Sequence, residues 1–333
     1  MARSPRIIFW ETTKQCNLKC NYCRMLKDDS GLELTTSEAF GIMRDIKDTF
    51  GNTLFVLSGG EPLLRKDIFE IINYASEIKL DIALATNGVL LDGNKAKFLK
   101  EKGVKRVSLS IDSIDEKKHD IARGMQGAFK KTRDSARILQ AEGIHFQINF
   151  TVTKSSKNEI RSVTEFAVSI GAVAVHYFVL VPVGCGKEVE KGTMLDADDN
   201  EEVLGLMKTL SKEFSIRIRP TCAPQYARFV EDGSYSGCLA GTGTFFISSE
   251  GYVYPCGYLP AKAGSLRENS VGDIWKDSLV FNNLRENNLK GACSSCYLKD
   301  KCRGCRARAF GITGDYLAED ITCVLANKEA MSA

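Results

Sequence analysis

The sequence predicts an α/β fold, a partial (β/α)6 TIM-like barrel followed by a smaller cysteine-rich domain. From residue 6 to about residue 212, six short apolar runs alternate with amphipathic stretches. After Pro220 the composition changes, and eight of the twelve cysteines lie between Cys222 and Cys323. The 333 residues are 44% hydrophobic and 26% charged, which excludes a disordered or fibrous chain. We therefore expect two domains, over residues 1–214 and 215–333.

The expected elements follow the alternation of apolar and amphipathic segments. Strands are expected over residues 7–12, 54–57, 82–85, 106–111, 145–152 and 174–181, and helices over 36–49, 67–78, 94–101, 127–141 and 158–170. Such βαβ units build a parallel sheet. Six units are too few for a closed eight-stranded barrel, so an open one is expected. Few helices are expected after Pro220, where glycine becomes frequent.

Charge and cysteine content narrow the function classes. The net charge of +3 is too small to predict a nucleic-acid or membrane-surface partner. Residues 166–186 carry no charge, but glycines and Pro182 interrupt them, so we expect a buried strand there rather than a membrane span. The chain begins without an apolar leader, which predicts a cytoplasmic location. Cytosolic cysteines in groups point to metal or redox chemistry.

The first cysteine group follows the first expected strand. Cys16, Cys20 and Cys23 form C-x3-C-x2-C. Three thiolates can hold three corners of a four-iron–four-sulfur cluster and leave the fourth iron open to a small molecule. Zinc is the alternative, but a structural zinc needs four ligands, and the next histidine in the sequence is His119.

This spacing, with Tyr22 before the third cysteine, resembles the radical S-adenosylmethionine (SAM) superfamily. In that family the open iron binds SAM. Ser58-Gly59-Gly60-Glu61-Pro62, after the second expected strand, is similar to the GGEP motif of the same family. Glycines let a backbone approach a ligand, and Glu61 can accept a hydrogen bond from an ammonium group.

Weaker matches to the same superfamily lie on the next expected strands or just after them, at the sheet edge where α/β folds build their sites. Ser110 is expected near the ribose, and Arg123 is expected to clamp the SAM carboxylate. The resemblance thus implies SAM contacts from Tyr22, Gly59, Gly60, Glu61, Asn87, Ser110, Arg123 and Asn149.

The second cysteine group resembles the SPASM extension of radical SAM enzymes, which carries one or two auxiliary four-iron–four-sulfur clusters. It reads C-x12-G-x4-C from Cys238, then C-x2-C-x5-C-x2-C from Cys293, with two residues before Cys305 where the commonest pattern has three. The resemblance implies one ligand set of Cys293, Cys296, Cys302 and Cys323, and another of Cys238, Cys256 and Cys305, with Cys222 available as the fourth ligand unless that site is open. A zinc ribbon is the alternative.

Longer stretches resemble a narrower group, the radical SAM enzymes of siroheme-derived haem synthesis. They include Trp10-Glu11, Cys23-Arg24, 178–186, 221–226, 254–260 and 302–309. The resemblance favours the haem synthases, which oxidatively decarboxylate two propionates of iron-coproporphyrin III to vinyl groups and make haem b. Didecarboxysiroheme deacetylases, makers of dioxo-haem and SPASM maturases of ribosomal peptides remain alternatives.

That chemistry implies an iron-tetrapyrrole substrate, a low-potential electron donor such as ferredoxin or flavodoxin, and an auxiliary cluster that accepts an electron. Arginine side chains are expected to bind the carboxylates of the tetrapyrrole substrate. Five candidates stay unranked, namely Arg24, Arg65, Arg217, Arg219 and Arg228. Arg303, Arg306 and Arg308 either supply charge to the auxiliary clusters or form a solvated face. Cys185 has no assigned role.

Overall fold

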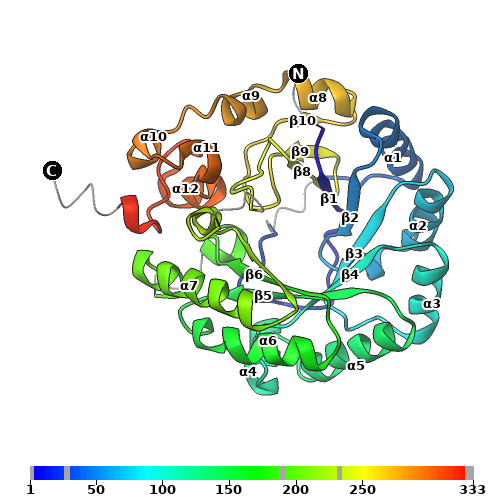
Figure 1. The fold of residues 1–333 in the computed structure, drawn as a ribbon. Helices are drawn as coiled ribbons and strands as arrows, with labels where there is room; N and C mark the ends of the chain where they lie inside the picture. The colour runs from blue at the N-terminus through cyan, green and yellow to red at the C-terminus, as the bar shows by residue number, and fades with distance from the viewer. Residues whose placement is uncertain (1–3, 26–30, 188–191, 231–234, 327–333) are drawn as a thin grey trace.

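A single sheet of ten strands forms the centre of the computed structural model, which describes residues 4–25, 31–187, 192–230 and 235–326 (Figure 1). Its strand order is β10-β9-β8-β1-β2-β3-β4-β5-β6-β7, and only the pairs β8–β9 and β9–β10 are antiparallel. The strands are β1 (Ile7–Glu11), β2 (Leu54–Ser58), β3 (Ile82–Thr86), β4 (Arg106–Ser110), β5 (Phe146–Val152), β6 (Ala174–Val179), β7 (Arg217–Thr221), β8 (Thr244–Ile247), β9 (Tyr252–Tyr254) and β10 (Gly264–Ser265).

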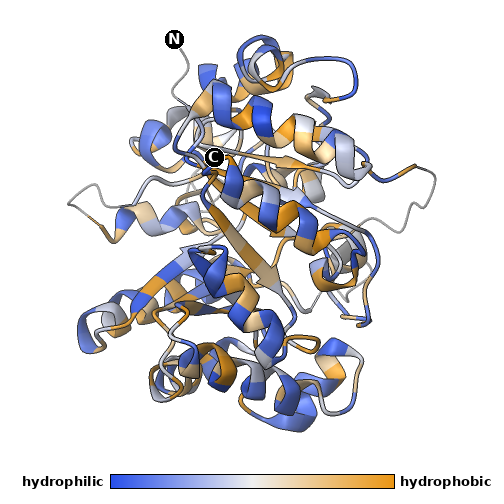
Figure 2. Ribbon diagram, turned by 90° about the vertical axis from the view of Figure 1, so that its right-hand side faces the viewer, coloured by the Kyte–Doolittle hydropathy of each residue, from blue (hydrophilic) through white to orange (hydrophobic). Residues whose placement is uncertain are grey.

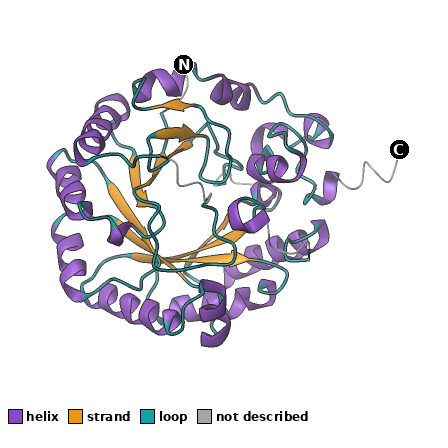
Figure 3. Ribbon diagram, turned by 180° about the vertical axis from the view of Figure 1, so that it is seen from behind, coloured by secondary structure: helices purple, strands orange, loops and turns teal. Residues whose placement is uncertain are grey.

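Helices surround the outer face of the curved sheet, so the strands form an incomplete ring inside a ring of helices (Figure 3). The mixed α/β fold expected from the sequence is confirmed, and the six expected strands and five expected helices are all present. Helices α4 and α7 were not expected. The helices of this layer are α1 (Thr36–Phe50), α2 (Ile68–Glu77), α3 (Gly93–Glu101), α4 (Glu116–Arg123), α5 (Ala128–Ala141), α6 (Ile160–Ser169) and α7 (Ala197–Glu213), with short 3-10 turns η1 (Pro62–Leu64), η2 (Lys157–Glu159), η3 (Gly184–Lys187) and η4 (Pro224–Arg228).

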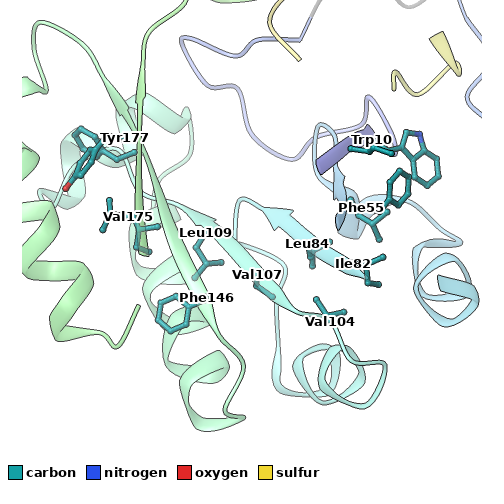
Figure 4. Close-up of a cluster of buried hydrophobic side chains, with 14 of the residues drawn as sticks. Trp10, Phe55, Ile82, Leu84, Val104, Val107, Leu109, Phe146, Val175 and Tyr177 are labelled. Carbon is teal, nitrogen blue, oxygen red and sulfur yellow. The ribbon is translucent and has the colours of Figure 1, made fainter. Parts of the chain in front are cut away.

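Along the strands, side chains point alternately to the helices and to the inside of the ring. The outward residues of β4, Val107 and Leu109, belong to the main hydrophobic core with Val175 and Tyr177 of β6 (Figure 4). Because side chains alternate along a strand, the residues between them face the opposite side of the sheet, which we call the lumen. The ribbon coloured by hydropathy shows both kinds of residue mixed along the helices (Figure 2).

The C-terminal part extends the sheet at both edges. Strand β7 pairs with β6, and β8 pairs with β1, so the sheet continues across the expected boundary at residue 214. The expectation of few helices after Pro220 is wrong, since the described residues of this part form five short ones: α8 (Val271–Asp277), α9 (Leu279–Glu286), α10 (Ala292–Ser295), α11 (Lys299–Cys302) and α12 (Arg306–Thr313). Most have too few turns to show an apolar period. Helices α9 to α12 complete the outer ring between the two sheet edges (Figure 1).

The uncharged run of residues 166–186 contains β6, as expected. Within the described ranges, no helix is both long and apolar enough to cross a membrane.

Candidate functional site

The first cysteine group lies in the loop after β1 and rests on the end of α4. Lys19 N donates to Arg123 O (3.1 Å) and Asn21 N donates to Ala122 O (3.1 Å). Gly124 ends α4 with φ 65°, and a Cβ there would lie 2.6 Å from Lys19 O. A side chain at this position would push the loop away, so the glycine permits the contact.

The sulfur atoms of this loop face one region and have polar partners. Leu18 N donates to Cys16 Sγ (3.4 Å), and Arg123 Nη1 donates to Cys20 Sγ (3.6 Å). Burial raises the pKa of the Cys16 thiol, and the adjacent Cys20 and Cys23 sulfurs raise it further. N–H donors and a guanidinium beside the sulfurs are the surroundings that stabilise cluster-bound thiolates. These three thiols therefore fit the three-cysteine cluster expected from their spacing.

The glycine pair packs against the same loop. Gly60 N donates to Thr13 O and Glu61 N donates to Gln15 O, both at 2.8 Å. A Cβ on Gly60 would lie 2.3 Å from Gln15 O. The glycines thus allow β2 to approach the backbone of the cysteine loop, a contact that was not predicted from the sequence, where these glycines were considered for a ligand or a strand-to-helix turn.

Glu61 is fully buried and joins the ends of β2 and β3. Its carboxylate accepts hydrogen bonds from Thr86 Oγ1 (2.7 Å), Asn87 N (2.8 Å) and Leu63 N (3.1 Å). Burial raises its pKa although these donors oppose the shift. Asn87 Nδ2 donates in turn to Asn17 Oδ1 (2.8 Å), beside Cys16. Sequence reasoning had not singled out Asn17.

The guanidinium group of Arg123 contacts other groups of the protein. Its guanidinium forms an ion pair with the buried Asp112, which follows β4, besides its contact with Cys20. The Tyr22 hydroxyl also lies against Asp112, and burial together with that carboxylate raises the pKa of Tyr22. Arg123 therefore ties the cysteine loop to the end of α4.

The remaining predicted SAM contacts lie on neighbouring strands. Ser110 of β4 is in register with Asn149 of β5, whose side chain accepts from Gln147 Nε2 (2.9 Å). Both residues belong to the face opposite the apolar core, so both point to the lumen. The structure thus brings Asn87, Ser110 and Asn149 to the same side of the sheet as the cysteine loop.

In the C-terminal part, four cysteines line one partly open pocket. They are Cys293, Cys296, Cys302 and Cys323, the expected first auxiliary set. Leu298 N donates to Cys296 Sγ (3.4 Å) and Arg306 Nη2 to Cys293 Sγ (3.9 Å). Four thiols around an empty space, with donors to the sulfurs, fit a four-iron–four-sulfur cluster.

A second set of cysteines lies beside this first auxiliary set. The thiols of Cys222 and Cys305 share a hydrogen bond, and the pKa of Cys256 is raised to about 12 by burial and by the nearby Cys238 and Cys305 sulfurs. Cys222 is thus placed with the three cysteines that lacked a fourth ligand. It has φ 57°, a left-handed conformation that is uncommon for a residue other than glycine.

Two of the three arginines near Cys305 do not form a solvated face. Arg306 is 2% exposed and Arg308 is fully buried. Arg308 donates to Asp320 Oδ2 (3.0 Å) and to Cys222 O (2.6 Å). Both arginines therefore place positive charge beside cysteines inside the protein.

The described residues include no group of three or more His, Cys, Asp or Glu side chains gathered closely enough to bind one metal ion.

Arg24 connects the two cysteine-rich regions. It follows Cys23, and its Nη1 donates to Gly257 O (3.2 Å), next to Cys256. Its guanidinium lies 4.6 Å from the Phe246 ring centroid and 6.0 Å from that of Tyr258. Cys185 is adjacent, since its N donates to Cys23 O (2.9 Å). The cysteine loop therefore contacts the auxiliary region directly.

Comparison with protein families gives two matches. Residues 10–167 match the radical SAM superfamily, and residues 238–306 match an iron–sulfur cluster-binding domain, SPASM.

Similar proteins cover nearly the whole chain. An AdoMet-dependent heme synthase of Methanosarcina barkeri is 41% identical over 97% of this chain and 97% of its own length. One of Nitratidesulfovibrio vulgaris is 36% identical over 96% and 92%. An Fe-coproporphyrin III synthase of M. barkeri is 28% identical over 97% and 88%. Among solved structures, SuiB of Streptococcus suis bound to S-adenosylmethionine has a TM-score of 0.79, at 20% identity, over 96% of this chain and 77% of that one.

Proposed function

Because the chain belongs to the radical SAM superfamily, with a SPASM domain and relatives in haem synthesis, we propose that it oxidatively decarboxylates iron-coproporphyrin III. Two propionates become vinyl groups, and the product is haem b. The observation that carries this proposal is the similarity, over nearly all of the chain, to proteins named AdoMet-dependent heme synthase. The Fe-coproporphyrin III synthase is less similar, and this favours the decarboxylase over that alternative.

The enzyme uses SAM, a SAM-cleaving four-iron–four-sulfur cluster and auxiliary clusters. We assign the first cluster to Cys16, Cys20 and Cys23. The auxiliary ligands are then two sets of four: Cys293, Cys296, Cys302 and Cys323 in one, and Cys222, Cys238, Cys256 and Cys305 in the other. We further assign residues 1–214 to the radical SAM core and 215–333 to the SPASM part.

When bound, SAM and its cluster would supply the means of removing a hydrogen atom from the substrate, and an auxiliary cluster would supply an electron acceptor. Each converted propionate loses one hydrogen atom from its β-carbon, one carbon dioxide and one electron. The electron needs an exit close to the substrate. We propose that Arg24 and Tyr258, which lie between Cys23 and Cys256, border that exit. A low-potential ferredoxin or flavodoxin is the proposed donor.

The described contacts rank the candidate arginines for the carboxylates. Arg65 pairs with Asp67 and donates to Thr12 O and Leu34 O. Arg228 pairs with Glu201. The guanidinium groups of Arg65 and Arg228 therefore already have partners within the protein.

Arg219 of β7 has no acidic partner among the described residues and lies on the lumen face, over the Tyr235 ring at 5.9 Å. Arg24 also has no salt bridge within the described ranges. Arg217 shares the lumen face of β7 but is exposed at the start of the strand. We therefore assign carboxylate binding to Arg219 and Arg24.

The test is anaerobic turnover of cluster-loaded protein with SAM, reductant and iron-coproporphyrin III, with products measured by mass spectrometry. The expected product has lost two formic-acid equivalents, with two SAM consumed per haem. Conversion of didecarboxysiroheme, with iron-coproporphyrin III unchanged, would replace the decarboxylase by a sister tetrapyrrole enzyme. A precursor peptide tested in parallel covers the maturase alternative.

A further inference from the structure

The chain has three histidines, and they occupy different environments. His119 is buried, and its Nδ1 accepts from Asp112 N (3.1 Å), so it has a structural partner. His145 is exposed, just before β5. His176 lies in the middle of β6.

His176 points to the lumen. Its neighbours in β6, Val175 and Tyr177, are fully buried in the core between sheet and helices, so the alternation of side chains turns His176 the other way. The same argument applies to Arg219, because its neighbour Ile218 packs against the core.

The imidazole of His176 has no hydrogen-bond partner within the described part of the chain. Its nearest described ring is Phe178, with centroids 6.5 Å apart. Burial and then the charge of Arg219 lower the pKa of His176 to about 3. The imidazole is therefore neutral at pH 7, and a ring nitrogen keeps its lone pair available. A half-buried, neutral histidine whose ring nitrogens have no partner among the described residues is suited to bind a metal.

The register places this histidine beside the predicted SAM site. Ser110, Asn149, His176 and Arg219 follow one another across β4 to β7. Adjacent strands are about 4.8 Å apart, so the imidazole lies one strand from Asn149 and one from Arg219. A flat ligand whose metal sits at His176 would extend its edge toward both.

We propose that His176 is an axial ligand of the substrate's iron, and that Arg219 binds a carboxylate at the ring edge. The inference rests on the proposed function, because it requires an iron tetrapyrrole as substrate. Imidazole is a common axial ligand of such iron. Ligation would orient the ring in the lumen, so that one propionate points toward the SAM residues.

The experiment compares cluster-loaded wild type, His176→Gln and the exposed control His145→Gln. Each protein binds ferric iron-coproporphyrin III or metal-free coproporphyrin III, without SAM or reductant. Wild type and His145→Gln should give the absorption and electron paramagnetic resonance spectra of imidazole-ligated ferric iron. In His176→Gln this signature should disappear and affinity for the iron form should fall tenfold or more, while affinity for the metal-free ring stays the same.

A second measurement does not depend on the variant folding. Wild type labelled with 15N-histidine should show hyperfine coupling between 15N and the ferric iron. Absence of that coupling, or an unchanged spectrum in His176→Gln, would overturn the inference while haem formation by wild type still supported the proposed function. If wild type neither binds nor converts iron-coproporphyrin III, the proposed function fails and the inference fails with it.

Discussion

Arg308 and Asp320 form an ion pair, Nη1 to Oδ2 3.0 Å, in which neither side chain has any exposed surface. Asp320 also accepts from Cys305 N (2.8 Å) and lines the cavity of the first auxiliary set. Arg308 donates to the carbonyl of Cys222 in the other set. The pair thus connects the two groups of cysteines, and its two charges are balanced inside the protein.

Breaking this pair on one side should destabilise the protein strongly. Arg308→Leu leaves the Asp320 carboxylate buried without its partner, which should cost about 3–5 kcal/mol in the free energy of unfolding. The double variant Arg308→Leu/Asp320→Leu should cost less than the sum of the single variants. Anaerobic denaturant unfolding of cluster-loaded protein measures both.

The matched control for this prediction is Arg161→Leu, which breaks an exposed pair with Glu213 and should change the unfolding free energy by about 0–1 kcal/mol. Equal effects of Arg308→Leu and Arg161→Leu would show that burial of the pair does not matter.

Removing the first cysteine group should abolish reductive SAM cleavage. The variant in which Cys16, Cys20 and Cys23 are all replaced by Ala loses the expected ligands of one cluster, while the cysteines of the C-terminal part are unchanged. 5′-Deoxyadenosine should therefore be absent, and auxiliary iron should remain. Production of 5′-deoxyadenosine at the wild-type rate would contradict the assignment.

The metal of the C-terminal part should be iron. Eight thiols in two sets of four predict clearly more than four irons per chain after anaerobic reconstitution, with acid-labile sulfide in proportion. Elemental analysis and Mössbauer spectra measure this. Four irons or fewer, with zinc for the remainder, would make the zinc-ribbon alternative correct.

Arg219→Gln should weaken substrate binding more than turnover. A charge-assisted hydrogen bond to one carboxylate is lost, so KM for iron-coproporphyrin III should rise about tenfold or more, with a smaller change in kcat. Steady-state haem formation measures both constants, and Arg161→Gln, on the outer helices, is the control. A fall in kcat at unchanged KM would place Arg219 outside the substrate site.

The outlines of the fold and of the cysteine groups could be predicted from the sequence because both depend on local order. The spacing of apolar residues predicts β1 to β6 and most of the helices between them, because each of these elements buries one apolar face. The spacing of Cys16, Cys20 and Cys23 already limits which metal groups they can hold. The C-terminal helices escaped prediction because they are too short for a period to be visible.

Tertiary structure alone decided which distant residues meet. It joined β8 to β1, placed Cys222 against Cys305, and buried Arg308 against Asp320, where the sequence shows only a basic run. It also turned His176 into the lumen, although β6 reads as an uninterrupted uncharged segment. These outcomes depend on register and long-range packing, which no local pattern contains. Composition and spacing determined the chemistry available to this chain, and the folded sheet decided where each group can act.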